Sequence, residues 1–328
     1  MILFWVAVLG SSLLLYVLLD GFDLGVGILF AFTHDERYRN RMLAAISPVW
    51  DGNETWLVLA GTVLFGAFPK VYAAALSAFY LPVLVGVGAL ILRGVAFEFR
   101  ESATSSRGLW NAALSGGSVV AAFIQGAAVG GLVQGLPLVD GQYVGGTFGW
   151  LSPFSVFCGI SLCLGYALLG ASWLVVKCEG EVRARAYRAL PWLIVAVVIC
   201  LTVIFLLSLA NHLPIMHRWE QEKVLWLFPA IGVVALGGLL VGIGRRFDSL
   251  PIVTSMIIVT AMFAVFLISF WPYMIPFQIT IQEAASPPES LRFMFWGAGL
   301  FAFPLTLAYT AVSYRAFSGK ILDSGGYP

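Results

Sequence analysis

The stretch Pro48-Val49-Trp50-Asp51-Gly52-Asn53-Glu54-Thr55-Trp56 decides how this chain is organised. It places two carboxylates and an asparagine at the start of a segment that is otherwise apolar. Ser47 and Pro48 predict that a helix begins here, because serine is a favoured N-cap and proline is tolerated at the first helical position. A step of three residues along a helix then places Asp51 and Glu54 on one face. Ionisable side chains inside a bilayer are costly, so these acids are candidates for function.

The composition is that of an integral membrane protein. Of the 328 residues, 60% are hydrophobic and only 11% are charged, whereas a soluble domain carries about 25% charged residues. The net charge of +1 argues against a nucleic-acid surface, which needs a basic patch. The four cysteines form no CxxC pair and are predicted to be small buried hydrophobic residues; they are Cys158, Cys163, Cys178 and Cys200.

Nine stretches are long and apolar enough to cross a bilayer, for which a helix needs about 20 residues. The connections between them are short, so we expect residues 1–328 to form a single, all-α, polytopic membrane domain. The predicted spans are approximately 2–31, 48–68, 73–98, 112–136, 151–176, 190–210, 224–244, 250–272 and 291–315.

Lysine and arginine are distributed unevenly between the two sides of this predicted domain. Of the 18 such residues, thirteen lie on one side, four lie on the other, and Arg93 lies within a span. Cytoplasmic loops of membrane proteins are enriched in Lys and Arg, so the richer side is predicted to be cytoplasmic. The N-terminus is then outside and the C-terminus inside. The four residues of the outer side are Lys70, Arg218, Lys223 and Arg292.

This topology brings ionisable residues of the first three spans to one depth near the inner surface. Five carboxylates meet two arginines there, so the charges cannot all be paired. Burial and like-charged neighbours both favour the protonated form of a carboxylic acid. We therefore predict that at least one acid is protonated at neutral pH, or that the site opens to water, as a proton-uptake path requires. The residues are Asp20 and Asp23 of the first span, Asp51 and Glu54 of the second, and Arg93, Glu98 and Arg100 of the third.

Simpler roles are compatible with the same residues. Asp20 could pair with Arg93 or Arg100 only to lock the helices together. Asp51, in the first turn of its helix, could only complement the positive end of the helix dipole. The sequence is therefore compatible both with a functional site and with ion pairs that only hold the helices together.

Two tryptophans flank the carboxylates of the organising stretch. Trp56 stands about 140° around the helix from Asp51, so it either packs against a neighbour or lines a route for a small apolar molecule. Trp50, next to the inner interface, is expected to be an aromatic anchor. In the first span, small residues such as Gly21 and Gly25 predict the close approach of a neighbouring helix.

No resident redox centre is predicted for this chain. A membrane haem held by paired histidines needs them inside spans, but His34, His212 and His217 are predicted to lie in loops. The sequence contains no Cys/His metal spacing, no P-loop and no Rossmann fingerprint. We expect no cofactor to be ligated by these residues.

Several motifs are together similar to one family. The segments 20–27 (DGFDLGVG), 48–56 (PVWDGNETW), 68–73 (FPKVYA), 92–100 (LRGVAFEFR) and 285–292 (ASPPESLR) resemble subunit II of cytochrome bd-type quinol oxidases. The resemblance extends to the cyanide-insensitive members and covers nearly the whole chain. It implies two four-helix bundles and one extra helix, in agreement with nine spans.

The resemblance also implies a function. Enzymes of this family oxidise quinol and reduce dioxygen to water in the bacterial inner membrane. Two b-type haems and one d-type haem are held by subunit I, the expected heterodimer partner, and a small accessory subunit can be present. By resemblance, Asp51 belongs to a proton route together with Asp23 and Glu54, and Trp56 lies at a dioxygen access route. Asn53 is expected to support this site.

Two other functions are alternatives to this one. A proton- or ion-coupled secondary transporter binds its substrate near the midplane on broken helices, whereas the charges of this chain are predicted at one end of the spans. A purely structural subunit, needed only for assembly of a haem protein, fits the same sequence and differs only in what the carboxylates do.

Overall fold

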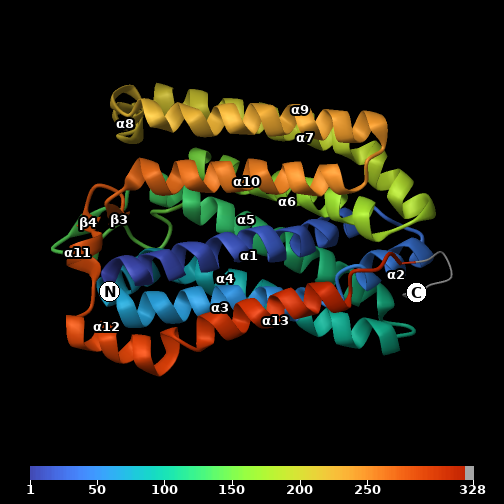
Figure 1. The fold of residues 1–328 in the computed structure, drawn as a ribbon, viewed down its shortest axis with the longest axis horizontal. Coiled ribbons are helices and arrows are strands. Elements are labelled where there is room, and N and C mark those ends of the chain that lie inside the picture. The colour runs from blue at the N-terminus through green and yellow to red at the C-terminus, as the bar shows by residue number, and fades with distance from the viewer. Residues whose placement is uncertain (322–328) are drawn as a thin grey trace.

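Helices make up nearly all of the computed structural model, which describes residues 1–321 (Figure 1). The long helices run side by side along one axis, and short helices and hairpins cap their two ends. The helices are α1 (Ile2–Ala31), α2 (Glu36–Ala44), α3 (Trp50–Ala67), α4 (Pro69–Ser102), α5 (Arg107–Gln134), α6 (Pro153–Lys177), α7 (Gly180–Ala210), α8 (Ile215–Gln221), η1 (Lys223–Trp226), α9 (Leu227–Arg245), α10 (Ser249–Phe270), α11 (Ile281–Ala284), α12 (Pro288–Met294), η2 (Phe295–Gly299) and α13 (Ala302–Ala316).

The protein is an all-α membrane protein. Eight helical segments among the described residues are long and apolar enough to cross a bilayer. Helix α3 lies parallel to them and packs along α1. Its 18 residues are less apolar because the first turns hold Asp51, Asn53 and Glu54. The count of nine spans and the division into two bundles therefore stay predictions.

Helix α1 is central and is packed closely against α6. A Cβ atom added to Gly25 would lie 1.8 Å from the carbonyl oxygen of Tyr166, and one added to Gly170 would lie 2.4 Å from the carbonyl carbon of Gly25. These distances leave no room for a side chain, so the two backbones touch, as the glycines of the first span predict. This contact fixes the depth of Asp20 and Asp23 relative to α6.

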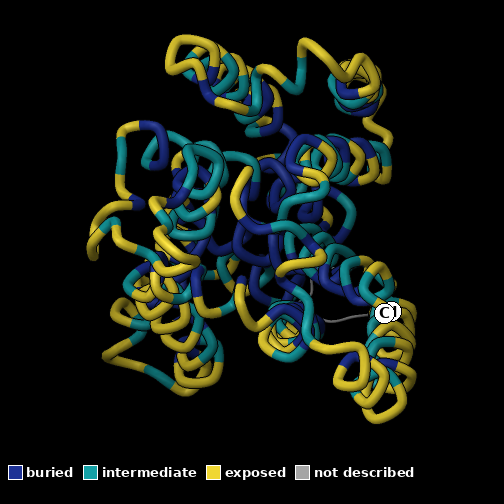
Figure 2. The backbone as a smooth tube through the Cα atoms, turned by 90° about the vertical axis from the view of Figure 1, so that its left-hand side faces the viewer, coloured by how far each residue is buried: buried dark blue, intermediate teal, exposed yellow. Residues whose placement is uncertain are grey.

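The degree of burial falls from the centre outwards. Figure 2 shows the buried residues gathered around the middle of the molecule and exposed residues around its rim. In Figure 1, helices α7 and α9 form a separate upper row. Helix α9 buries only Ala235, Leu239 and Gly242 completely. Apolar side chains on such an outer helix face lipid in a membrane protein, so they need no protein partner.

Two short antiparallel hairpins lie in the connections. Strands β1 (Leu138–Val139) and β2 (Gln142–Tyr143) are joined by Asp140 and Gly141, which both have positive φ. This is the backbone that a two-residue hairpin turn requires, and Asp-Gly is a favoured pair for it. Strands β3 (Tyr273–Ile275) and β4 (Ile279–Thr280) form the second hairpin beside α11.

The helix of the organising stretch begins later than predicted. Helix α3 starts at Trp50 with Val49 as its N-cap, and no side chain caps it. Ser47 and Pro48 instead lie in a turn, because the unpredicted helix α2 ends just before them and the N–H of Val49 bonds the carbonyl of Ile46. The predicted roles of Ser47 and Pro48 at the helix start are therefore wrong.

The last predicted span is interrupted. Helix α12 passes through the π-helical turn η2 before α13 begins at Ala302. Pro304 has no N–H to donate and sits in the first turn of α13, where none is needed. Helix α4 also bends, at Phe79, because Pro82 cannot bond the carbonyl of Ala78. His217, predicted in a loop, lies in the short helix α8.

Candidate functional site

Arg93 is the centre of a buried charge cluster formed by α1, α3 and α4. Its Nη1 atom lies 2.9 Å from Oδ1 of Asp20 and 2.9 Å from Oε1 of Glu54. The side chains of Arg93 and Asp20 are 1% and 0% exposed, and that of Glu54 is 24% exposed. One guanidinium nitrogen thus joins a sealed acid to an acid that is still in contact with the surface.

Asp23 lies in the same cluster but is held differently. It is fully buried, and Oδ2 accepts a hydrogen bond of 2.7 Å from Nδ2 of Asn53. The amide oxygen of Asn53 accepts one of 3.0 Å from the hydroxyl of Tyr314 on α13. Asn53 therefore links two helices, and its amide faces the acid. Asp23 has no direct bond to a cation within the described residues.

The cluster contains more hydrogen-bonding capacity than it uses. Four buried atoms have no hydrogen-bond partner within the described part of the chain: Oδ1 of Asp23, Oδ2 of Asp20, and Nε and Nη2 of Arg93. The cluster also holds three carboxyl groups but only one arginine, which is ion-paired with Asp20 and Glu54. Buried charges without partners are unfavourable. The cluster is thus suited to hold a proton on one of its acids.

Three residues predicted for the cluster lie elsewhere: Glu98, Asp51 and Arg100. Glu98 is exposed on α4, and Asp51 is exposed on α3. A step of three residues turns a helix by about 300°, and the boundary of the buried face falls between Asp51 and Glu54. Asp51 therefore faces out from the chain at the start of α3, while Glu54 turns towards Arg93.

Arg100 forms a network of its own at the end of α4. Its guanidinium group donates to Glu36 at 2.6 Å, to Asn40 at 2.9 Å and to Asn111 at 2.5 Å. Burial tends to raise the pKa of Glu36, but hydrogen bonds from Arg39 and Asn111 and the charge of Arg100 outweigh it and lower this pKa. Sequence reasoning missed these partners, since α2 was not predicted, although Asp35 before a charged run is a recognisable N-cap.

A polar branch extends from Asp20 into the apolar interior. Nε2 of Gln125 on α5 donates to the hydroxyl of Tyr16 at 2.7 Å, and the hydroxyl of Tyr166 on α6 donates to Oε1 of Gln125 at 2.9 Å. Tyr16 is one helical turn from Asp20. Three polar groups in the middle of a membrane bundle thus satisfy one another next to the cluster. The sequence signal for Gln125 was its position inside an apolar span.

The two tryptophans pack on different partners. Trp56 is fully buried, and its ring meets Phe303 of α13 edge-on at 5.9 Å. Its indole N–H has no hydrogen-bond partner within the described residues. Trp50 is half-buried and stacks on Phe97 of α4 at 4.9 Å. Trp56 therefore lies on the side of α3 that α13 covers, with Asn53 on the same face.

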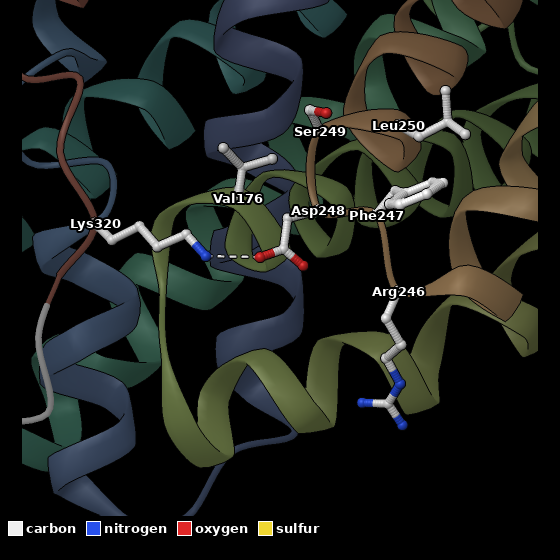
Figure 3. Close-up of a pocket in the computed structure, with 7 residues that line it drawn as sticks. All are labelled: Val176, Arg246, Phe247, Asp248, Ser249, Leu250 and Lys320. Atoms are coloured by element: carbon white, nitrogen blue, oxygen red, sulfur yellow. Dashed lines mark hydrogen bonds and ion pairs between the residues drawn. The ribbon is translucent and has the colours of Figure 1, made fainter.

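A second polar cluster lies at the loop between α9 and α10 (Figure 3). The carboxylate of Asp248 accepts hydrogen bonds from Arg183 at 2.6 Å, Tyr187 at 2.8 Å and Lys320 at 2.6 Å. Burial tends to raise the pKa of Asp248, but these hydrogen bonds outweigh it and lower the pKa to about 2. A cavity of about 520 Å³ adjoins the cluster, lined by Val176, Arg246, Phe247, Asp248, Ser249, Leu250 and Lys320.

Within residues 1–321, no group of three or more His, Cys, Asp and Glu side chains is arranged to hold a metal ion. His34, His212 and His217 are all exposed. The acids around Arg93 are instead arranged as an ion-pair and hydrogen-bond cluster.

Comparison with known proteins identifies the family. The family model for cytochrome bd terminal oxidase subunit II matches residues 1–317. The chain belongs to the cytochrome bd terminal oxidase subunit II family. The predicted resemblance is thereby confirmed, and the chain is a subunit of a cytochrome bd quinol oxidase, an oxidoreductase complex.

Relatives of this subunit II chain extend over its whole length. It is 30% identical to cytochrome bd-I ubiquinol oxidase subunit 2 of Escherichia coli strain K12, over 97% of this chain and 94% of that protein. It is 28% identical to a probable cytochrome oxidase subunit 2 of Haemophilus influenzae, with the same coverage. The bd oxidase structure from Geobacillus thermodenitrificans matches with a TM-score of 0.81 at 16% identity, covering 97% of both chains, which shows a shared fold.

Proposed function

We propose that this chain supplies part of the proton-uptake route and part of the dioxygen route to haems held by subunit I. The observation that supports the proposal is the surplus of acid around Arg93: this buried cation is ion-paired with Asp20 and Glu54, and a third acid, Asp23, is buried in the same cluster. Reduction of dioxygen to water consumes protons, so a terminal oxidase needs groups that take them up. In this proposal the uptake side is the cytoplasmic one, since the uneven distribution of Lys and Arg favours that orientation.

The acids form a series of increasing burial. Asp51 is exposed at the start of α3, Glu54 follows three residues later and is 24% exposed, and Asp20 is sealed behind Arg93. In this proposal Asp51 collects protons at the open face of α3, and Glu54 exchanges them with the buried pair. Asp23, bonded to Asn53 within the same cluster, takes up and releases a proton within the membrane.

The open face of α3 is the surface through which protons would pass to subunit I. Asp51, Val58 and Phe65 are exposed there and recur at the spacing of one helix face. A charged group facing lipid is costly, so a protein partner over Asp51 is favoured. Subunit I provides that cover and holds the two b-type haems and the d-type haem, which supply the redox chemistry. This chain offers no histidine inside a span for them.

The proposed dioxygen route follows the other face of α3. Dioxygen is apolar and concentrates in lipid, so its route needs apolar walls rather than hydrogen bonds. Trp56 and Phe303 form an aromatic pair between α3 and α13, and Ala60 and Val63 continue the same buried face. In this proposal dioxygen moves along this apolar wall, whereas protons move between Asp51, Glu54 and the buried acids.

The proton route is tested by Asp51→Asn and Glu54→Gln in the assembled enzyme. We expect quinol-driven oxygen consumption to fall at least about tenfold in Glu54→Gln, since a positioned acid or base contributes a hundredfold or more. Asp51→Asn should have a smaller effect, because water can replace an exposed group. Haem content is measured beside turnover. If activity and haem content fall in step in both variants, the carboxylates serve assembly only and the structural alternative is favoured.

The dioxygen route is tested by Trp56→Phe and Trp56→Ala. Phenylalanine keeps an aromatic wall, whereas alanine opens a cavity of the kind that a buried large residue leaves. We expect the apparent dioxygen affinity to change several-fold in Trp56→Ala and little in Trp56→Phe, with turnover measured at saturating quinol. An unchanged dioxygen affinity in the alanine variant would remove Trp56 from the route.

A further inference from the structure

The last helix delivers one polar group to the buried cluster. Helix α13 buries no residue completely, yet the hydroxyl of Tyr314 donates to Oδ1 of Asn53 at 3.0 Å. Nδ2 of Asn53 in turn donates to Oδ2 of Asp23 at 2.7 Å. Tyr314 is half-buried, whereas Asn53 and Asp23 are buried. A chain of two hydrogen bonds therefore leads from the surface of α13 to the acid.

The ring of Tyr314 is fixed by aromatic neighbours. It meets Trp173 of α6 at 6.0 Å and 71°, and Phe22 of α1 at 6.4 Å and 89°. Phe22 and Trp173 stack on each other at 4.2 Å. Edge-on aromatic contacts of this kind stabilise a ring in one orientation. The ring packing does not involve the hydroxyl, so the two can be separated experimentally.

The segment that follows α13 is fastened to the end of α6. Lys177 donates to the backbone carbonyls of Phe317 and Gly319, and the N–H of Ile321 donates to the carbonyl of Lys177 at 2.8 Å. Lys320 is bonded to Asp248. These contacts begin three residues after Tyr314. The position of Tyr314 is therefore fixed by its aromatic neighbours and by the attachment of the segment that follows it.

The two hydrogen bonds of the Asn53 amide affect the protonation of Asp23. A carboxylate only accepts hydrogen bonds, so the NH₂ group of Asn53 stabilises Asp23 in its ionised form. A turned amide would present its carbonyl oxygen, which can accept only from a protonated acid. The hydroxyl of Tyr314, by donating to Oδ1, holds the NH₂ group towards Asp23.

We propose that Tyr314 is a positioning residue for Asp23: it fixes the amide of Asn53 and thereby the protonation state in which Asp23 is held. This inference rests on the proposed role of Asp23 in proton uptake. The ionisable groups around Asp23 come from each helix of the cluster, and all remain in place when the hydroxyl is removed; they are Asp20 of α1, Glu54 of α3 and Arg93 of α4, with Tyr16 and Tyr166 beyond Asp20.

The test compares Tyr314→Phe with Tyr309→Phe in the assembled complex. Tyr309 lies on the same helix with its ring beside Gly52, but its hydroxyl has no hydrogen-bond partner in the described part of the chain. We expect the pH at which quinol-driven turnover is half-maximal to rise by about one unit in Tyr314→Phe, a tenfold change in proton concentration. The profile of Tyr309→Phe should superimpose on that of the unsubstituted enzyme.

Infrared difference spectra supply a second measurement. The carboxyl band of Asp23 is the one that Asp23→Asn removes, and it should shift in Tyr314→Phe but not in Tyr309→Phe. If Tyr314→Phe assembles poorly, the band is read in the assembled fraction, and an unchanged band there overturns the proposal in favour of packing. Profiles that are identical for the two phenylalanine variants overturn it as well. Full turnover in Asp23→Asn would instead remove the proposed proton route itself.

Discussion

Two clusters of acid, arginine and tyrosine lie in this molecule, and they are built on opposite principles. Around Asp248, one carboxylate accepts hydrogen bonds from Arg183, Tyr187 and Lys320. Around Arg93, one guanidinium group is paired with two acids, a third acid lies in the same cluster, and four buried atoms lack partners within the described residues. The first cluster is satisfied and partly exposed, whereas the second is unsatisfied and sealed.

The difference shows how a structural ion pair can be told from a reactive one. Donors in excess keep Asp248 ionised over the physiological range, so it fastens the C-terminal segment and exchanges no proton there. In the cluster around Arg93 the acids outnumber the cation instead. The same residue types therefore serve stability in one cluster and, in our proposal, proton uptake in the other.

The largest expected effect comes from removing the central cation. Arg93→Gln removes the cation that is paired with Asp20 and Glu54, and breaking a buried ion pair costs about 3–5 kcal/mol. We expect little assembled, haem-containing complex from this variant. Arg183→Gln is the matched control, because Asp248 keeps Lys320 and Tyr187 and the site is partly exposed, so the loss should be about 1 kcal/mol or less. Yield and thermal midpoint are measured; equal yields of the two variants would contradict the comparison.

A smaller but more specific effect is expected from neutralising one acid in each cluster. Asp23→Asn should lower quinol-driven oxygen consumption at least about tenfold with normal haem content, since positioned proton-transfer groups commonly contribute a hundredfold or more. Asp248→Asn should leave turnover unchanged. Loss of turnover in Asp248→Asn, or full turnover in Asp23→Asn, would show that burial and surplus charge do not mark the reactive site.

The smallest effect concerns stability in acid. Asp248 has a pKa of about 2 in the folded chain, below the unfolded value of about 3.9. Its contribution is therefore complete above about pH 4 and is lost as the pH falls towards 2. The stability difference between the unsubstituted chain and Asp248→Asn, measured by thermal unfolding, should shrink across that interval. A difference that stays constant from pH 5 to pH 3 would indicate that the carboxylate is not held by its donors.

The sequence predicted that Asp20 lies at the same depth as Arg93 and Arg100, because helix period and topology sufficed for that, and the structure shows that Arg93 is its partner. Asp20 and Arg93 each lie on a face that the neighbouring spans cover, and charge bias placed them at one depth. The same reasoning failed for Asp51 and Glu98. Residues on one helix face span a range of angles around the axis, and the tertiary packing decides how much of that range is buried. Glu54 lies just inside the buried part of the face of α3, and Asp51 lies just outside it.

Residues that join the site from distant parts of the chain were beyond sequence reasoning. Tyr314 lies 261 positions from its partner Asn53. Its placement depends on the interruption between α12 and α13, which a continuous apolar stretch does not reveal. Gln125 stood out as polar, but its partners Tyr16 and Tyr166 are defined only by how α1, α5 and α6 pack. The helical period predicts which face of its own helix a residue lies on, but it does not predict which other helix packs against that face.

The outward position of Asp51 has a consequence for the life of this polypeptide in the cell. An acid on the uncovered side of a membrane helix is tolerated poorly in hydrocarbon. In a copy without its partner subunit this acid stays uncovered, and we expect membrane proteases to remove such a copy. We expect the solitary chain to be short-lived when it is produced alone, and Asp51→Leu to prolong its lifetime in that state. Matched supply of the two subunits would then follow from a single exposed carboxylate.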